Sequence, residues 1–155
     1  MPANQQPIFI LNGNTVPARL NAYNTSTTTL TTTGTPDSFD LVIGGANGSR
    51  VDGVRLTASE TVVGAGTASF TNKIVRIFIC DIVANANPRI ITEYLFTGMV
   101  ASNVTNTTAR PTALVTFDQP IILKSTQKLV ITMCNGATAY STGNQLDAVP
   151  YAGDY

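Results

Sequence analysis

The feature that most limits how this chain can fold is a series of short segments in which apolar and polar residues alternate. Val54, Leu56 and Ala58 would share one face of an extended strand, while the residues between them would share the other. The segments 72–81 and 128–134 repeat this period of two. No segment of a dozen residues keeps the 3.6-residue period of a helix. The pattern therefore predicts sheets with one buried face and one wetter face.

Clusters of turn-forming residues separate these segments at the spacing expected of a sandwich or barrel. The composition agrees, because Thr, Val, Asn and Gly are abundant while charged residues make up only 12% of the 155 residues. The length suits one domain. We predict an all-β, single-domain antiparallel β-sandwich. Its strands are expected in residues 38–44, 50–58, 72–81, 89–96, 112–123 and 128–134 and in the closing AVPYAGDY.

The first 22 residues are expected to form an extended N-terminal arm and a first strand, with the sandwich in residues 23–155. The arm has no basic region and its apolar run is short, so we expect neither a signal peptide nor a membrane span. A Thr-rich segment, residues 24–37, follows. It fits either a strand with two polar faces or an extended loop along the surface.

The glycine-rich sequence GGANGSR, residues 44–50, could be a phosphate-binding loop or a turn between strands. A P-loop needs Gly-Lys-Ser/Thr followed by a helix, whereas Gly48 is followed by Ser49 and Arg50 and then by an alternating segment. Asn47-Gly48 is typical of a tight turn with a positive φ. The sequence therefore predicts a turn, and we expect no nucleotide or other cofactor.

The residues available for catalysis are few. The chain has no His, which excludes a Ser-His-Asp triad and histidine metal sites, and no Asp-rich calcium motif occurs. Most carboxylates fall at turns or strand ends, and Glu93 is expected to pair with an Arg such as Arg76 across two strands. The balanced charge, nine basic against nine acidic residues, does not favour nucleic-acid binding. We expect no enzyme, no metal and no small-molecule substrate.

Three residues in apolar segments have more than one interpretation. Cys80 and Cys134 could form a disulfide between strands, although we favour two buried free thiols. Phe78 lies opposite the face formed by Val75 and Ile77. Either the N-terminal arm covers Phe78 or a neighbouring chain buries it.

Taken as an ordered set, GGANGSRVDGVRLTA, NKIVRIFICD, RIITEYLF, KLVITM and YAGDY resemble small structural proteins from the head-gene regions of tailed bacteriophages. The similarity covers about residues 23–155. It implies a jelly-roll-like sandwich that serves as a capsid decoration, or cement, protein, and it brings no catalytic residues. It also implies binding to the major capsid protein on the capsid exterior as a homotrimer, after synthesis in the host bacterial cytoplasm.

Two segments are hypothesised to dock on the capsid: the apolar part of the arm and the Thr-rich residues 24–35. Extended chain can add to another protein through backbone hydrogen bonds. The residues expected at a capsid or protomer interface are Ile8, Phe9, Ile10, Leu11 and Phe78. The alternative is a glycan- or host-surface-binding module of a phage head fibre or tail, which would present exposed Tyr and Asn side chains.

Overall fold

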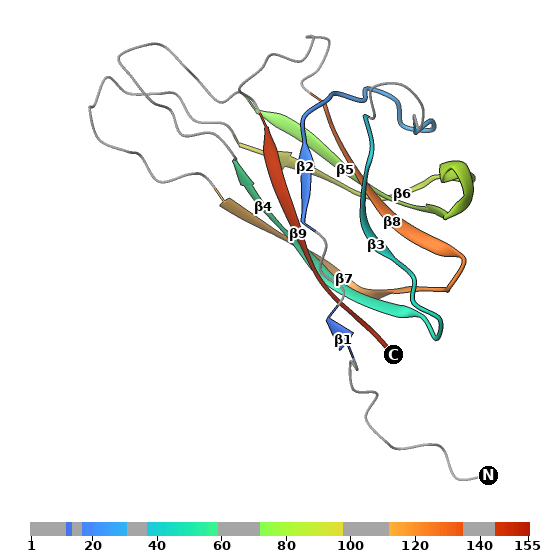
Figure 1. The fold of residues 1–155 in the computed structure, drawn as a ribbon. Helices are drawn as coiled ribbons and strands as arrows, with labels where there is room; N and C mark the ends of the chain where they lie inside the picture. Colours follow the sequence, from blue (N-terminus) through green and yellow to red (C-terminus); the bar gives the residue numbers. More distant parts are fainter. Residues whose placement is uncertain (1–11, 14–16, 31–36, 59–71, 98–111, 135–144) are drawn as a thin grey trace, which may run out of the picture.

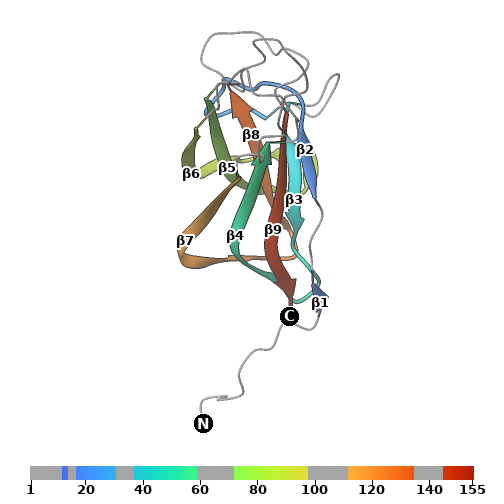
Figure 2. The same ribbon diagram turned by 90° about the vertical axis from the view of Figure 1, so that its left-hand side faces the viewer.

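A computed structural model describes residues 12–13, 17–30, 37–58, 72–97, 112–134 and 145–155. These residues form two antiparallel sheets that pack face to face (Figures 1 and 2). One sheet contains β1 (Asn12–Gly13), β2 (Ala18–Leu20), β4 (Ser49–Ala58), β7 (Thr112–Leu123) and β9 (Leu146–Asp154). The other contains β3 (Phe39–Ile43), β5 (Lys73–Asp81), β6 (Arg89–Phe96) and β8 (Gln127–Cys134). Among the described residues no helix is both long and apolar enough to cross a bilayer.

The strand order is that of a jelly roll. β2 pairs with β9, β3 with β8, β4 with β7 and β5 with β6, so the chain behaves like a long hairpin that wraps around the core. The resulting sheets have the orders β2-β9-β4-β7 and β3-β8-β5-β6, and β1 also pairs with β9. Eight strands in two sheets of this kind define the double-sheet jelly roll. The predicted all-β antiparallel sandwich is confirmed.

The core lies between the two sheets and follows the alternation in the sequence. Val54, Leu56 and Ala58 of β4 are at most 1% exposed, and they face Val75 and Ile77 of β5, which are fully buried. Burying such apolar surface is the main favourable contribution to folding. The alternate residues point outward, as the sequence predicted.

The sandwich begins before residue 23. Leu20 of β2 is fully buried in the main core, and Ala18 lies in the same cluster, because β2 pairs with β9 along its length. β1 and β2 therefore belong to the first sheet, and β2 is a first strand of the kind expected within residues 1–22. The apolar arm residues 7–11 lie outside the described residues.

The described part of the Thr-rich segment is a loop. Residues 24–30 contain no strand; Asn24 instead donates its backbone N–H to the carbonyl of Met133, and its side-chain amide binds the carbonyl of Thr29. Arg76 holds the same segment by donating to the carbonyl of Thr25. Of the two interpretations of the sequence, the extended loop is the correct one here. Residues 31–36 lie outside the described residues.

This covering segment, residues 24–30, explains the position of Phe78. Phe78 is fully buried on the outer face of the second sheet, in a small cluster with Leu30, Cys80 and Val130. Leu30 comes from the covering segment, so within one chain the Thr-rich loop covers the aromatic ring. The expectation that the N-terminal arm or a neighbouring chain would bury Phe78 is corrected by this contact, and Phe78 offers no exposed side chain to a partner.

The two cysteines are free thiols. Both are buried, and each lies on a strand of the second sheet. Cys134 is opposite Ile74 on β5, whereas Cys80 is six residues further along that strand. Six residues of strand span about 20 Å, far beyond the reach of a disulfide.

The glycine-rich segment is a turn between β3 and β4. Gly48 has a φ of 102°, and its N–H donates to the carbonyl of Gly45 at 2.9 Å. A Cβ on Gly44 would lie 2.0 Å from the carbonyl oxygen of Lys124, so only glycine fits there. The Ser49 hydroxyl accepts from the Gly45 N–H and donates to the Asp154 carboxylate, which fastens the turn to the end of β9. The turn interpretation is confirmed.

Candidate functional site

The longest sheet edges of the molecule lie on one side of the sandwich. β3 contacts β2 and β9 across the core, so these strands form one side. The opposite ends of the two sheets, β6 and β7, then form the other side, as Figure 2 shows. β6 has eight residues and β7 has twelve, whereas β2 and β3 have three and five. Within the described residues, these long edges offer the most strand backbone that no other strand pairs with.

The same side carries most of the large apolar side chains that remain exposed. Eight large apolar residues are exposed among the described residues, and five of them lie on β6 or β7. Leu95 on β6 is 57% exposed and Leu114 on β7 is 55% exposed. Covering half of a leucine side chain contributes about 1 kcal/mol. We call this set the β6/β7 surface: Ile90, Ile91, Leu95, Leu114 and Ile122.

The two edge strands of this surface differ in regularity and charge. β6 has a bulge at Ile91 and carries Glu93, whose carboxylate accepts from Arg76 at 2.7 Å. Bulges and charged residues on an edge hinder pairing with another strand. β7 instead has a regular, uncharged stretch, Thr112–Thr116, before its ladder is interrupted by residues 117–120 opposite Asp52. β6 is therefore a protected edge, and the first half of β7 is not.

Each ion pair described here has at least one exposed member, although the side chains of Arg76 and Lys128 are largely buried. The Arg76–Glu93 pair expected from the sequence is confirmed, and both residues lie directly opposite each other in the β5–β6 ladder. The Arg76–Glu93 pair contributes no more than about 1 kcal/mol, because Glu93 is half exposed and solvent screens the pair. Further pairs are Arg19–Asp147, Arg50–Asp52 and Lys128–Asp40.

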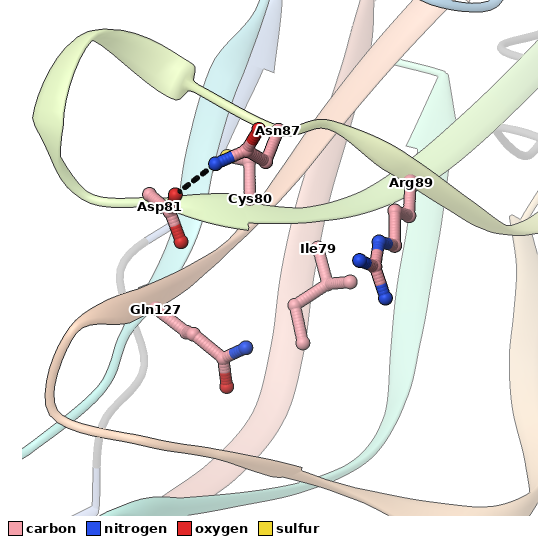
Figure 3. A pocket seen from close by; sticks show the side chains of 6 residues that line it. All are labelled: Ile79, Cys80, Asp81, Asn87, Arg89 and Gln127. Atoms are coloured by element: carbon pink, nitrogen blue, oxygen red, sulfur yellow. Dashed lines mark hydrogen bonds between the residues drawn. The ribbon is translucent and has the colours of Figure 1, made fainter.

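A polar hollow of about 280 Å³ lies beside the end of β5 (Figure 3). Arg89 and Gln127 extend into it from opposite sides, and Ile79 forms part of its wall. Asp81 is its single lining carboxylate and accepts from the Asn87 amide at 2.6 Å. A glycosidase needs two facing carboxylates, and this lining supplies one. The hollow can hold a small polar group but presents no pair of acid and base.

A second, shallower hollow of about 250 Å³ lies on the outer face of the first sheet. Arg55, Leu114 and the half-exposed Tyr151 line it. Arg55 makes no ion pair with the described residues. Within the described part of the chain, no three Cys, Asp or Glu residues come together as metal ligands.

The structure places the expected interface residues differently from the sequence prediction. Ile8, Phe9, Ile10 and Leu11 lie outside the described residues, and Phe78 is buried. The exposed apolar residues of β6 and β7 were missed. A signal for them exists in the sequence, since 89–96 and 112–123 carry apolar residues at both odd and even positions, whereas a strand with one wet face carries them at one parity only.

Comparisons with known proteins do not assign this chain to a family. No family model matches the chain, and no curated protein matches it. A chain in the solved structure of infectious bursal disease virus, Gt strain, superposes with a TM-score of 0.29 at 11% identity. The match covers 98% of this chain and 35% of the viral chain. A superposition this loose supports no conclusion, so the fold assignment rests on the strand order of the chain itself.

Proposed function

We propose that this chain is a non-enzymatic structural protein of a virus particle, and that it decorates the outer surface of a tailed-phage capsid and stabilises the head. The observation that carries the proposal is the β6/β7 surface. A rigid sandwich that exposes five large apolar side chains on its two long edge strands is suited to binding another protein. The resemblance of its strand motifs to phage head-region proteins supplies the identity of that partner, the major capsid protein.

The assembled form follows from the same resemblance. The protein would be made in the cytoplasm of the host bacterium and added to the capsid exterior as a homotrimer. Each copy would contribute modest binding energy, and many copies acting together would resist expansion of the shell. This role needs shape, exposed apolar surface and a stable core, and it needs no reacting groups.

Binding to heads tests the proposal through the β6/β7 surface. Purified protein is added to heads of the encoding phage that were assembled without it, and bound protein is measured by co-sedimentation. Leu95→Glu places a charge in the surface and should weaken binding at least about tenfold, equivalent to about 1.4 kcal/mol. Ile43→Glu is the matched control, because Ile43 is 47% exposed but lies on β3, on the opposite side of the sandwich.

Equal effects of the two substitutions on binding to heads would contradict the role of the β6/β7 surface.

The second candidate function, a glycan-binding module, is suggested by the hollow beside Tyr151, because aromatic rings are common platforms for sugars. Binding of the protein to a glycan array, with no binding to heads, would replace the capsid proposal by this one.

A further inference from the structure

We infer that the regular part of β7, Thr112–Thr116, is a homotypic contact: it pairs antiparallel with the same strand of a second copy, with Leu114 on the two-fold axis. The two first sheets would thereby join into one continuous sheet. This inference does not rest on the capsid proposal, although it assigns Leu114, one of the five residues of the β6/β7 surface, to a contact between two copies of the chain. It adds a two-fold contact to the three-fold one that the phage resemblance implies.

The first support is that β7 is the unprotected edge. β7 is the last strand of its sheet and pairs with β4 on one side, and no other strand of the described residues pairs with its other side. The remaining edges are blocked: β2 is three residues long, β3 is bulged next to Asp40, and β6 is bulged at Ile91 and carries charge. An unblocked edge of this kind is a template on which another strand can pair.

The second support is that the sequence of β7 selects the register. The regular stretch is bounded by Pro111, which has no N–H, and by the irregular residues 117–120, which include Pro120. A two-fold antiparallel pair that uses all five residues between these limits must be centred on Leu114. Thr112 then lies opposite Thr116 of the second copy, and Ala113 lies opposite Val115.

The third support is that each face of the joined sheet matches itself in this register. Val115 is buried and Ala113 packs against the main core, so their pairing continues the apolar inner layer. On the outer face two half-exposed Leu114 side chains meet, flanked by pairs of threonines, and both combinations are favourable across strands.

Disulfide trapping tests this contact. Residues opposite each other in an antiparallel pair have Cα atoms about 4.5–5.5 Å apart, which suits a disulfide. Leu114→Cys should form a covalent dimer on mild oxidation of the full-length protein. Leu95→Cys is the matched control, because Leu95 is 57% exposed against 55% for Leu114 but lies on the blocked edge β6. The native Cys80 and Cys134 are buried and should not react.

The register is tested with two further variants. Thr112→Cys and Thr116→Cys should each stay uncrosslinked alone, because their symmetry mates would be about 13 Å apart, but should crosslink when mixed. Unchanged melting temperatures would show that the variants fold.

The inference is overturned if Leu114→Cys does not crosslink faster than Leu95→Cys, or if the mixture crosslinks no faster than the single variants. Failure of head binding with successful trapping would overturn the proposed function and leave the contact standing. Failure of disulfide trapping with normal head binding would overturn the contact between copies and leave the proposed function standing.

Discussion

At the scale of single residues, Ala84 is held in an unfavourable backbone conformation. Its φ is 54° and its ψ is 24°, in the left-handed region that suits glycine and asparagine. The neighbouring left-handed residues, Asn85 and Asn87, tolerate this region well. Ala84 lies in the short 3₁₀ turn Val83–Asn85 between β5 and β6, and its side chain is exposed. The turn therefore contains one residue that is poorly suited to its backbone.

Ala84→Gly should raise the free energy of unfolding by about 0.5–1 kcal/mol, because glycine adopts the left-handed region without strain. Ala86→Gly is the matched control: Ala86 is also exposed, but its φ of −64° is ordinary. That control should lower the stability by a similar amount through the added freedom of the unfolded chain. Urea unfolding of both variants measures the difference. Equal changes in the free energy of unfolding of the two variants would contradict the strain at Ala84.

At the scale of elements, the covering segment 24–30 sets the properties of the sheet face beneath it. Together with Phe78 and Val130, Leu30 encloses Cys80, which is 3% exposed. Burial raises the pKa of the Cys80 thiol to about 11, and nearby Lys128 opposes this only in part. The folded protein therefore disfavours the thiolate. The stability that this provides is complete below the pKa of the unfolded thiol and is lost as the pH rises towards the folded pKa.

The free energy of unfolding should accordingly fall by up to about 1.4 kcal/mol per pH unit between about pH 9 and 11 as a result of Cys80 alone. Cys80→Ala removes this contribution and should show a flatter profile over the same range. The measurement is the difference between the two proteins at each pH, so that titrating tyrosines cancel. Parallel profiles would show that Cys80 ionises as readily in the folded as in the unfolded chain.

The elements also show how far the sequence predicts this fold. The strand at 89–96 and the one at 112–123 agree with β6 and β7 to the residue, because turn-forming residues bound them on both sides. A first strand was expected within residues 1–22, but its bounds were not, since the three residues of β2 carry no measurable periodicity. Its strand conformation comes from pairing with β9, more than a hundred residues away. Local patterns identify long strands and miss those that depend on a distant partner.

At the scale of the whole molecule, strand order is what the sequence could not give. Alternation shows that a strand has a buried face, but it does not show which strand lies beside it. The β6/β7 surface depends on that order: Leu95 and Leu114 are nineteen positions apart in the sequence, and their strands lie on the same side of the sandwich only because β6 and β7 end their respective sheets. The Phe78 interface was misjudged for the same reason, since its cover comes from residues 24–30.

Two truncations test where the folded sandwich begins. A chain that begins at Asn12 keeps β1 and β2 and should unfold with the same midpoint as the full-length protein. A chain that begins at Tyr23 loses Leu20, which is fully buried, together with the pairing of β2 along β9. It should lose at least about 3 kcal/mol of stability, since removing a buried leucine side chain alone costs 2–5 kcal/mol.

The same two truncated chains separate the effect on folding from the effect on binding to the capsid. If the apolar arm residues 7–11 dock on the capsid, the chain that begins at Asn12 remains folded yet no longer binds heads in the co-sedimentation assay. Full decoration by this chain would remove the arm from the interface and leave the β6/β7 surface to account for binding. Equal stability of the two truncations would instead place the boundary at residue 22, and β2 would then add nothing to the core, which its burial opposes.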